Sequence, residues 1–166
     1  ETTVILTGHT GYVYSVAWDS AGVRLATGSD DNTARIWDVR TGENTRILTG
    51  HTGYVMSVAW DSAGVRLATG SDDKTARIWD VRTGETTVIL TGHTGYVYSV
   101  AWDSAGVRLA TGSSDKTARI WDAQTGQCLA VLQVDAPVLE VAWSPNGEWL
   151  ALGCHDGRVL WVRVRV

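Results

Sequence analysis

Residues 8–38 of the chain read GHTGYVYSVAWDSAGVRLATGSDDNTARIWD. This stretch recurs almost letter for letter at residues 50–80 and 92–122, which is a spacing of 42 residues. A fixed period of this length indicates stacked supersecondary units, because one such unit cannot bury its apolar face alone. The full units are 1–42, 43–84 and 85–126, and residues 127–166 are a fourth, degenerate copy. We therefore predict one repeat domain that covers residues 1-166.

Within one unit, short apolar segments alternate with turn residues. The segments of the first unit are Thr3–Leu6, Val13–Trp18, Val23–Ser29 and Thr33–Val39. Val, Ile, Thr and Trp favour pleated strands, and no segment is long enough for a helix of ordinary length. Gly22 lies in the turn between the second and third segments, where it is free to take a positive φ. Each unit is thus predicted to be a four-stranded antiparallel meander in an all-β protein.

The composition excludes some classes of protein. A chain of 166 residues that is 44% hydrophobic and 19% charged is typical of a folded globular domain. The net charge of −4 provides no basic surface for phosphate backbones, so no nucleic acid partner is predicted. No apolar run approaches the roughly 20 residues that span a bilayer, so no membrane segment is predicted. The chain begins at Glu1 and its only methionine is Met56. We expect from this that a natural start or a leader has been removed; the compartment stays open, with a cytoplasmic location favoured.

The two cysteines do not predict a disulfide framework or a metal site. Cys128 and Cys154 lack CxxC spacing, and both lie in the fourth unit. His155 follows Cys154 directly, but adjacent residues of a strand point to opposite faces of a sheet. We interpret the two residues as structural thiols, and we predict no metal and no cofactor.

The repeated stretch also carries a family resemblance. Gly8-His9 is followed by Trp37-Asp38, and the same pairs recur in the second and third units. This pattern resembles the WD-repeat signature, and LATGSDDxTARIWD is similar to the family's second and third strands. The resemblance covers essentially all of 1–126 and loosely 127–166. It implies a β-propeller, in which four-stranded blades surround a central channel and the segment before each Gly-His is the outermost strand of the preceding blade. The near-identical blades also resemble recently amplified bacterial or engineered propeller arrays.

The same resemblance implies a buried hydrogen-bond set in each intact blade. In this set a Trp indole donates to a Thr hydroxyl, the hydroxyl donates to a His ring, and the ring donates to a turn Asp. A hydroxyl, a His and an Asp can also be interpreted as a nucleophilic triad. Their threefold recurrence and the lack of an oxyanion site favour the structural role, and we predict no enzyme activity. The matching positions are His9, Thr27, Asp31, Trp37, His51, Thr69, Asp73, Trp79, His93, Thr111, Asp115 and Trp121.

The fourth unit departs from this pattern. Val134-Asp135-Ala136 replaces the Gly-His region, and Leu152 stands where the threonine is expected. Trp161 comes one position early, so Val162 takes the tryptophan site, although Asp156 remains at the turn. The hydrogen-bond set is therefore expected to be absent from the fourth blade.

A candidate binding face also follows from the resemblance. In the family, ligands bind the face with the loops after the outer strand and between the second and third strands. Tyrosines there, together with acidic residues, would suit a peptide with basic or apolar side chains, because tyrosine offers a large contact area at low entropy cost. They would equally serve to cover the mouth of the channel, and the residues leave this choice open. The matching positions are Tyr12, Tyr14, Asp30, Tyr54, Met56, Asp72, Tyr96, Tyr98 and Ser114.

Three functions are compatible with these observations. The first is a rigid protein-interaction scaffold of the WD-repeat kind, and the second is a repeat array with no evolved ligand. The third is a sugar-binding, lectin-like propeller that uses its nine tryptophans. Seven of these tryptophans hold repeat positions in the core, which leaves Trp149 and Trp161 and weakens the third hypothesis.

The order of the strands predicts how the ring closes. The chain starts with an outer strand, Thr3–Leu6, that has no blade before it, and ends with a third strand, Arg158–Val166, that has no outer partner. Closing four blades would need about 90° per blade, whereas two copies give eight blades at about 45° each. We therefore predict a head-to-tail homodimer that forms one eight-bladed propeller, ahead of a closed four-bladed monomer and, third, a trimer of twelve blades. In the homodimer, residues 1–6 of each copy complete the fourth blade of the other.

Overall fold

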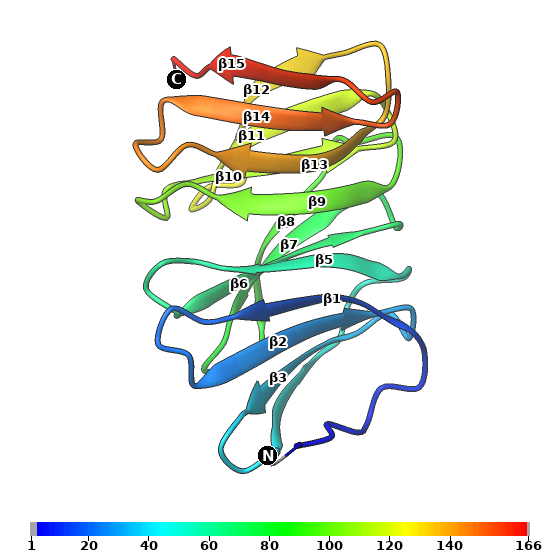
Figure 1. Ribbon diagram of the computed structural model, residues 1–166, viewed down its shortest axis with the longest axis vertical. Coiled ribbons are helices and arrows are strands. Elements are labelled where there is room, and N and C mark those ends of the chain that lie inside the picture. Colours follow the sequence, from blue (N-terminus) through cyan, green and yellow to red (C-terminus); the bar gives the residue numbers. More distant parts are fainter. Residues whose placement is uncertain (1–2, 166) are drawn as a thin grey trace.

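The computed structural model describes residues 3–165, and within this range every regular element is a β-strand, as the sequence predicts. Fifteen strands form four antiparallel sheets that follow one another along the chain (Figure 1). We call these sheets blades 1 to 4. Blade 1 consists of β1 (Val13–Trp18), β2 (Arg24–Ser29), β3 (Ala34–Asp38) and β4 (Asn44–Leu48). Blade 2 consists of β5 (Val55–Trp60), β6 (Arg66–Ser71), β7 (Ala76–Asp80) and β8 (Thr86–Leu90). Blade 3 consists of β9 (Val97–Trp102), β10 (Arg108–Ser113), β11 (Thr117–Asp122) and β12 (Cys128–Gln133). Blade 4 consists of β13 (Val138–Trp143), β14 (Trp149–Cys154) and β15 (Val159–Arg163).

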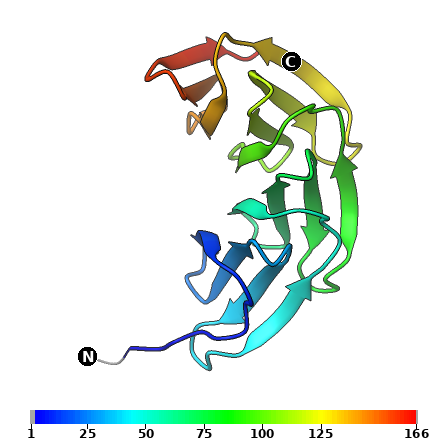
Figure 2. The ribbon, with the colours of Figure 1, turned by 90° about the vertical axis from the view of Figure 1, so that its right-hand side faces the viewer.

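Each blade is a meander in which neighbouring strands of the sequence pair with one another. The blades stack face to face along an open arc, and the two ends of the arc do not meet within the chain (Figure 2). Blades 1 to 3 have four strands, and blade 4 has three. The strands before Gly50-His51 and Gly92-His93 belong to the preceding blades, as the family resemblance implies, since β4 pairs with β3 and β8 pairs with β7.

Turn chemistry sets the ends of the strands. Gly22 has a φ of 68°, which confirms the positive φ expected for the turn between β1 and β2. In the same turn, Asp19 Oδ1 accepts hydrogen bonds from the backbone N–H groups of Val23 (2.9 Å) and Arg24 (3.1 Å). This carboxylate therefore holds the turn closed from inside.

The hydrophobic core lies between blades. Between blades 1 and 2, Ile36 and Leu48 of the first pack against Val55, Val58 and Leu67 of the second. Burial of one Val, Leu or Ile side chain contributes about 1.5–3 kcal/mol. The core of the protein is thus a series of blade junctions, and no blade has a core of its own.

The two ends of the arc expose the faces that other blades bury. Val16 of blade 1 is 64% exposed, whereas its repeat equivalent Val58 is 6% exposed because blade 1 covers it. Trp18 is 59% exposed, and at the other end of the arc Trp161 of blade 4 is 69% exposed. We call the blade 1 surface around Val13, Val16 and Trp18 the first end face. The blade 4 surface around Ala142, Trp149, Val159 and Trp161 is the last end face.

The N-terminal segment differs from the sequence expectation. Residues 3–12 form no strand, because the described residues contain no blade before blade 1 that could provide a partner. The side chains of Val4 and Leu6 nevertheless lie within 4 Å of the position that a Cβ on Gly42 would take. Toward the C-terminus, the strand expected over residues 158–166 is shorter in the structure, where β15 covers Val159–Arg163. Glu1, Thr2 and Val166, which the closure prediction includes, lie outside the described residues.

Candidate functional site

The structure brings the predicted His, Thr, Asp and Trp of each intact blade into one chain of hydrogen bonds. In blade 2, Trp79 Nε1 donates to Thr69 Oγ1 at 2.9 Å, and His51 Nε2 lies 2.7 Å from the same oxygen. His51 Nδ1 lies 2.7 Å from Asp73 Oδ2. An ionised carboxylate only accepts, so Nδ1 carries the proton and Nε2 accepts the threonine hydroxyl. Every donor in this chain therefore has an acceptor.

Blades 1 and 3 repeat this geometry closely. The His to Thr distances are 2.6 Å for His9–Thr27 and 2.7 Å for His93–Thr111. The His to Asp distances are 2.7 Å for His9–Asp31 and 2.8 Å for His93–Asp115. Trp37 and Trp121 donate to their threonines at 2.9 Å. Each histidine ring also meets its tryptophan edge to face, with ring centroids 6.0–6.1 Å apart.

The turn aspartate joins this chain of hydrogen bonds to the backbone. Asp73 accepts from the backbone N–H of Thr52 (3.1 Å) and of Thr75 (2.9 Å), and from the Thr75 hydroxyl (2.7 Å). Burial acts to raise the pKa of Asp73, but the bonds from His51 and Thr75 outweigh it and hold the pKa well below its ordinary value. One ionised carboxylate thus connects the loop before the first strand to the turn between the second and third strands.

The threonine oxygen in this arrangement is enclosed. Thr69 and Thr111 are fully buried, and each hydroxyl oxygen already contacts an indole and an imidazole. A hydroxyl in this position has no route to a substrate, which argues against the nucleophile that the residue types alone suggest. Among the described residues, no group of three or more His, Cys, Asp or Glu side chains is arranged to hold a metal ion.

Blade 4 replaces the hydrogen-bond set with apolar side chains. Leu152 is fully buried, and Val162 packs against the same core between blades 3 and 4. Asp156 is exposed, and its Oδ2 accepts a hydrogen bond from Arg158 Nε at 2.7 Å. The turn aspartate therefore persists in blade 4 without the partners that it has in the other blades.

The candidate binding face is assembled at one edge of the blades. The ring centroids of Tyr14 and Tyr54, from neighbouring blades, lie 6.1 Å apart, and those of Tyr96 and Tyr98 lie 6.3 Å apart. Tyr12, Tyr14, Tyr54 and Tyr96 are exposed, whereas Met56 and Tyr98 are half-buried. Partial burial is the larger cause that raises the pKa of the Tyr14 hydroxyl, and the negative charge of Asp30 is the second. The structure thus places tyrosine rings and carboxylates side by side on this face.

The turns with Asp30, Asp72 and Ser114 support the tyrosine loops. The backbone N–H of each donates to the carbonyl of the tyrosine at the start of the same blade, at 3.0, 3.1 and 2.9 Å. A Cβ on Gly53 would lie 1.8 Å from Asp72 Oδ1 and 2.9 Å from the backbone nitrogen of Asp73, so the close approach of this loop to the turn favours glycine. Blade 3 lacks this carboxylate, since Ser114 takes the position and accepts a bond from the Tyr96 N–H at 2.8 Å.

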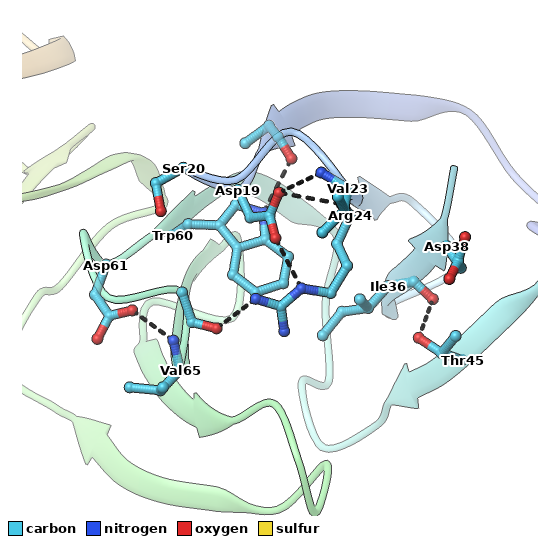
Figure 3. Close-up of polar contacts among 12 residues, drawn as sticks. Asp19, Ser20, Val23, Arg24, Ile36, Asp38, Thr45, Trp60, Asp61 and Val65 are labelled. Carbon is cyan, nitrogen blue, oxygen red and sulfur yellow. Dashed lines mark hydrogen bonds and ion pairs between the residues drawn. The ribbon is translucent and has the colours of Figure 1, made fainter. Parts of the chain in front are cut away.

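Sequence reasoning missed an arginine that joins neighbouring blades. Arg24 donates to Asp19 Oδ2 at 2.8 Å and to the Gly64 carbonyl of blade 2 at 2.6 Å, and its guanidinium carbon lies 4.6 Å from the centroid of the Trp60 ring (Figure 3). Trp60 Nε1 in turn donates to the Ala17 carbonyl at 3.0 Å. Arg66 with Trp102 and Arg108 with Trp143 repeat this junction. The available signal was an arginine at the same place in each of the first three units and at no such place in the fourth.

The described part of the chain holds no helix with the length and apolar character that crossing a membrane requires.

Removal of the turn carboxylate should destabilise an intact blade. We expect Asp73→Ala to lower the free energy of unfolding by about 1–3 kcal/mol, because the donors of His51, Thr52 and Thr75 lose a buried acceptor. The matched control is Asp156→Ala, whose carboxylate is exposed and should cost clearly less. Urea denaturation of both variants measures the two losses. Equal losses would show that the buried chain of hydrogen bonds adds nothing to blade stability.

The same residues predict a loss of stability in acid. Burial acts to raise the pKa of Asp115, but hydrogen bonds from Thr117 and His93 hold it at about 2. Burial lowers the pKa of His93 in spite of its bond to Asp115. Both groups bind fewer protons in the folded chain, so their stabilisation is complete above the unfolded pKa values of 6.5 for His and 3.8 for Asp.

The urea midpoint should therefore decrease when the pH is lowered below 6.5, and decrease further when it is lowered below 4. Asp115→Asn should make the second decrease shallower. Midpoints that stay level from pH 7 to pH 3 would contradict this expectation.

Comparison with known proteins places local matches on single repeats. Ribosome biogenesis protein ERB1 of Chaetomium thermophilum is 58% identical over 38 residues, which are 23% of this chain and 5% of that protein. THO complex subunit 3 of Arabidopsis thaliana is 59% identical over 32 residues, which are 19% of this chain and 10% of that protein. The match thus spans a small part of each of these curated relatives.

The family comparison covers far more of the chain. The model "WD domain, G-beta repeat" matches residues 1–38, 42–80, 84–122 and 126–161. These four ranges follow the four repeat units and confirm the resemblance drawn from the Gly-His and Trp-Asp pairs. The chain therefore belongs to the WD-repeat family.

Proposed function

We propose that the chain is one half of an eight-bladed propeller, which a second copy completes, and that the ring serves as a non-catalytic scaffold for protein interactions. The observation that carries this proposal is the pair of end faces. The junction between a blade and the next one recurs three times inside the chain, and the two end faces are the two unpaired halves of that same junction. Exposed apolar faces of this kind indicate an interaction surface.

The N-terminal segment supports closure by a strand from the other copy. Val4 and Leu6 approach Gly42 as Val88 and Leu90 approach Gly126, where the latter pair belongs to the outer strand of the preceding blade. The segment thus already lies against blade 1 in the position of an outer strand whose blade is missing. In blade 1, β3 pairs with β4 through Ala34↔Leu48, Arg35↔Ile47 and Ile36↔Arg46. Leu6, Ile5 and Val4 lie one repeat before Leu48, Ile47 and Arg46, and β15 is the equivalent of β3 in blade 4. The same register therefore sets these three residues of one copy opposite β15 of the other. The pairs are Val159↔Leu6, Leu160↔Ile5 and Trp161↔Val4.

The geometry favours two copies over one. A single closed chain would need about 90° per blade, at the lower limit of four blades, whereas two copies need about 45°. The blades follow an open arc with their end faces apart (Figure 2). A two-fold ring joins each last end face to a first end face and leaves no open sheet edge.

The tyrosine face is the surface on which such a scaffold would bind a peptide. Adjacent exposed rings and the carboxylates of Asp30 and Asp72 suit a segment with basic and apolar side chains. The relatives named for ribosome biogenesis and for the THO complex are consistent with a role in protein assemblies. Neither the fold nor these relatives supports the cytoplasmic location that the sequence favoured.

Light scattering tests the ring. We expect a mass of twice 17.9 kDa at micromolar concentration. Gly153→Ala should abolish the dimer and leave the chain folded. A Cβ at Gly153 meets nothing closer than 3.6 Å within the chain, but its equivalent at Gly112 would lie 2.8 Å from a Val138 methyl across a junction.

Gly112→Ala is the matched control, because it crowds an internal junction and should lower the free energy of unfolding by about 1–3 kcal/mol. A monomeric wild-type chain, or a Gly153→Ala variant that dimerises normally, would refute the ring. Deletion of residues 1–6 should also remove the dimer or cause aggregation.

A displayed library of short random peptides tests the binding face. Selected sequences should be rich in Lys, Arg and apolar residues, and the Tyr14→Ala, Tyr54→Ala double variant should bind them about tenfold more weakly. Val131→Ala, an exposed position on β12, is the control and should bind normally. No enrichment over a bare support would leave the tyrosines as a cover for the channel mouth.

A further inference from the structure

The three internal junctions share one polar and aromatic arrangement, which Figure 3 shows between blades 1 and 2. An arginine of one blade lies over a tryptophan of the next blade, with 4.5–4.6 Å between the guanidinium carbon and the ring centroid. That tryptophan donates its indole N–H to an alanine carbonyl of the first blade at 3.0–3.1 Å. An aspartate on the first blade, such as Asp61 for Arg66, holds the arginine at 2.8–2.9 Å.

Blade 4 has changed this arrangement as a unit. Trp149 stands at the arginine position and Ser144 stands at the aspartate position. The two residues are still in contact, since the backbone N–H of Trp149 donates to Ser144 Oγ at 2.9 Å. An aspartate kept here without its arginine would be a carboxylate buried without a counter-charge once another blade covered it, which is destabilising. The joint replacement therefore leaves a face that can still be buried.

A second tryptophan lies on the same face. Trp161 stands where Ile36, Ile78 and Ile120 face the next blade. The pairs Trp149↔Arg163 and Ala151↔Trp161 set Trp149, Ala151, Trp161 and Arg163 on one side of the sheet. The opposite side, with Leu150 and Leu152, packs on blade 3. Both tryptophans that the repeat pattern leaves unexplained thus lie on the last end face.

We propose that Trp149 and Trp161 of one copy form an aromatic seam with Trp18 of a second copy. In this seam the indole N–H of that Trp18 donates to the Ala142 carbonyl of the first copy. This inference rests on the ring closure proposed above. Trp18 is the repeat equivalent of Trp60, Trp102 and Trp143, and within residues 3–165 no blade provides the arginine or the carbonyl that those three contact. Ala142 is exposed and equivalent to Ala17, Ala59 and Ala101, which supply the carbonyls inside the chain.

The occupant of this face is a second copy because Val13, Val16 and Trp18 of the first end face are the repeat equivalents of the residues that cover such a face inside the chain. Aromatic side chains supply a large buried area and favourable ring-to-ring contacts. The seam places a ring of the second copy where an internal junction has the guanidinium of the preceding blade. The charge on this face belongs to Arg163, whose guanidinium carbon lies 5.8 Å from the Trp149 ring centroid and whose half-exposed head group is 3.7 Å from Glu148 Oε2. The seam therefore has a different chemistry from the three internal junctions, although it uses the same positions.

Sedimentation equilibrium of single and double variants tests the seam. We expect Trp149→Ala to raise the dimer dissociation constant about a hundredfold, because one tenfold loss occurs at each of two seams. Trp161→Ala should act in the same direction. In the Trp18→Ala background, Trp149→Ala should add little, since its contact is already lost. Val131→Ala, on an exposed position away from both end faces, should leave the constant unchanged.

The outcomes separate the seam from the ring itself. A wild-type chain that sediments as a monomer would overturn the ring and the seam together. A wild-type dimer whose constant is unchanged by Trp149→Ala would keep the ring and overturn the aromatic seam. Losses from Trp149→Ala and Trp18→Ala that simply add would also overturn it, because residues without mutual contact behave independently. Circular dichroism confirms that each variant is folded, which is expected because Trp18, Trp149 and Trp161 are exposed in the single chain.

Discussion

A blade is a sheet of four short strands with two apolar faces, and each face needs a neighbouring blade to cover it. This constraint governs the rest of the structure. Ile36 and Leu48 are fully buried only because blade 2 covers them, and Val58 is buried only because blade 1 does. Stability therefore depends on the number of complete junctions, as in other repeat proteins whose units contact only their neighbours. An array that ends in two uncovered faces has a strong reason to associate.

The hydrogen-bond set in each intact blade has a different task from the junctions. It lies near one end of the strands, where His51 and Asp73 connect the entering loop to the turn after the second strand. Because that turn also carries Asp72, whose N–H bonds the Tyr54 carbonyl, the buried set positions the loops of the tyrosine face. A rigid interior of buried, satisfied polar groups thus supports a surface on which individual residues can vary. The change from Asp72 to Ser114 between blades 2 and 3 is one such variation.

Much of this could be predicted from the sequence, because a 42-residue period fixes the number of blades and the order of strands. The positive φ of Gly22 followed from the turn residues around it, and the positions of the His, Thr, Asp and Trp side chains followed from the family pattern. The arginine across each junction was missed, because its partner lies almost one repeat away and periodicity alone does not say which faces meet. The bonds from Arg24 to Asp19 and to Gly64 become visible only when the blades are stacked. The lack of a strand over residues 3–12 has the same origin, since a strand needs a partner and residues 3–165 provide none for this segment.

Nearly identical repeats raise a problem of specificity that the degenerate fourth unit can solve. If all junctions were alike, the last end face could also dock on an internal blade that opens transiently, and copies joined out of register would compete with the ring. A protein that must form one assembly gains from a junction that differs in chemistry from the others. In blade 4 the arginine and its aspartate are both lost, and tryptophans occupy the exposed face. The face toward blade 3 is aliphatic: it keeps Leu150 and has Leu152 in place of the threonine. On this face, the positions at which blade 4 departs from the repeat therefore lie where two copies would meet. The internal junctions keep the arginine, the aspartate and the alanine carbonyl that hold the arc together.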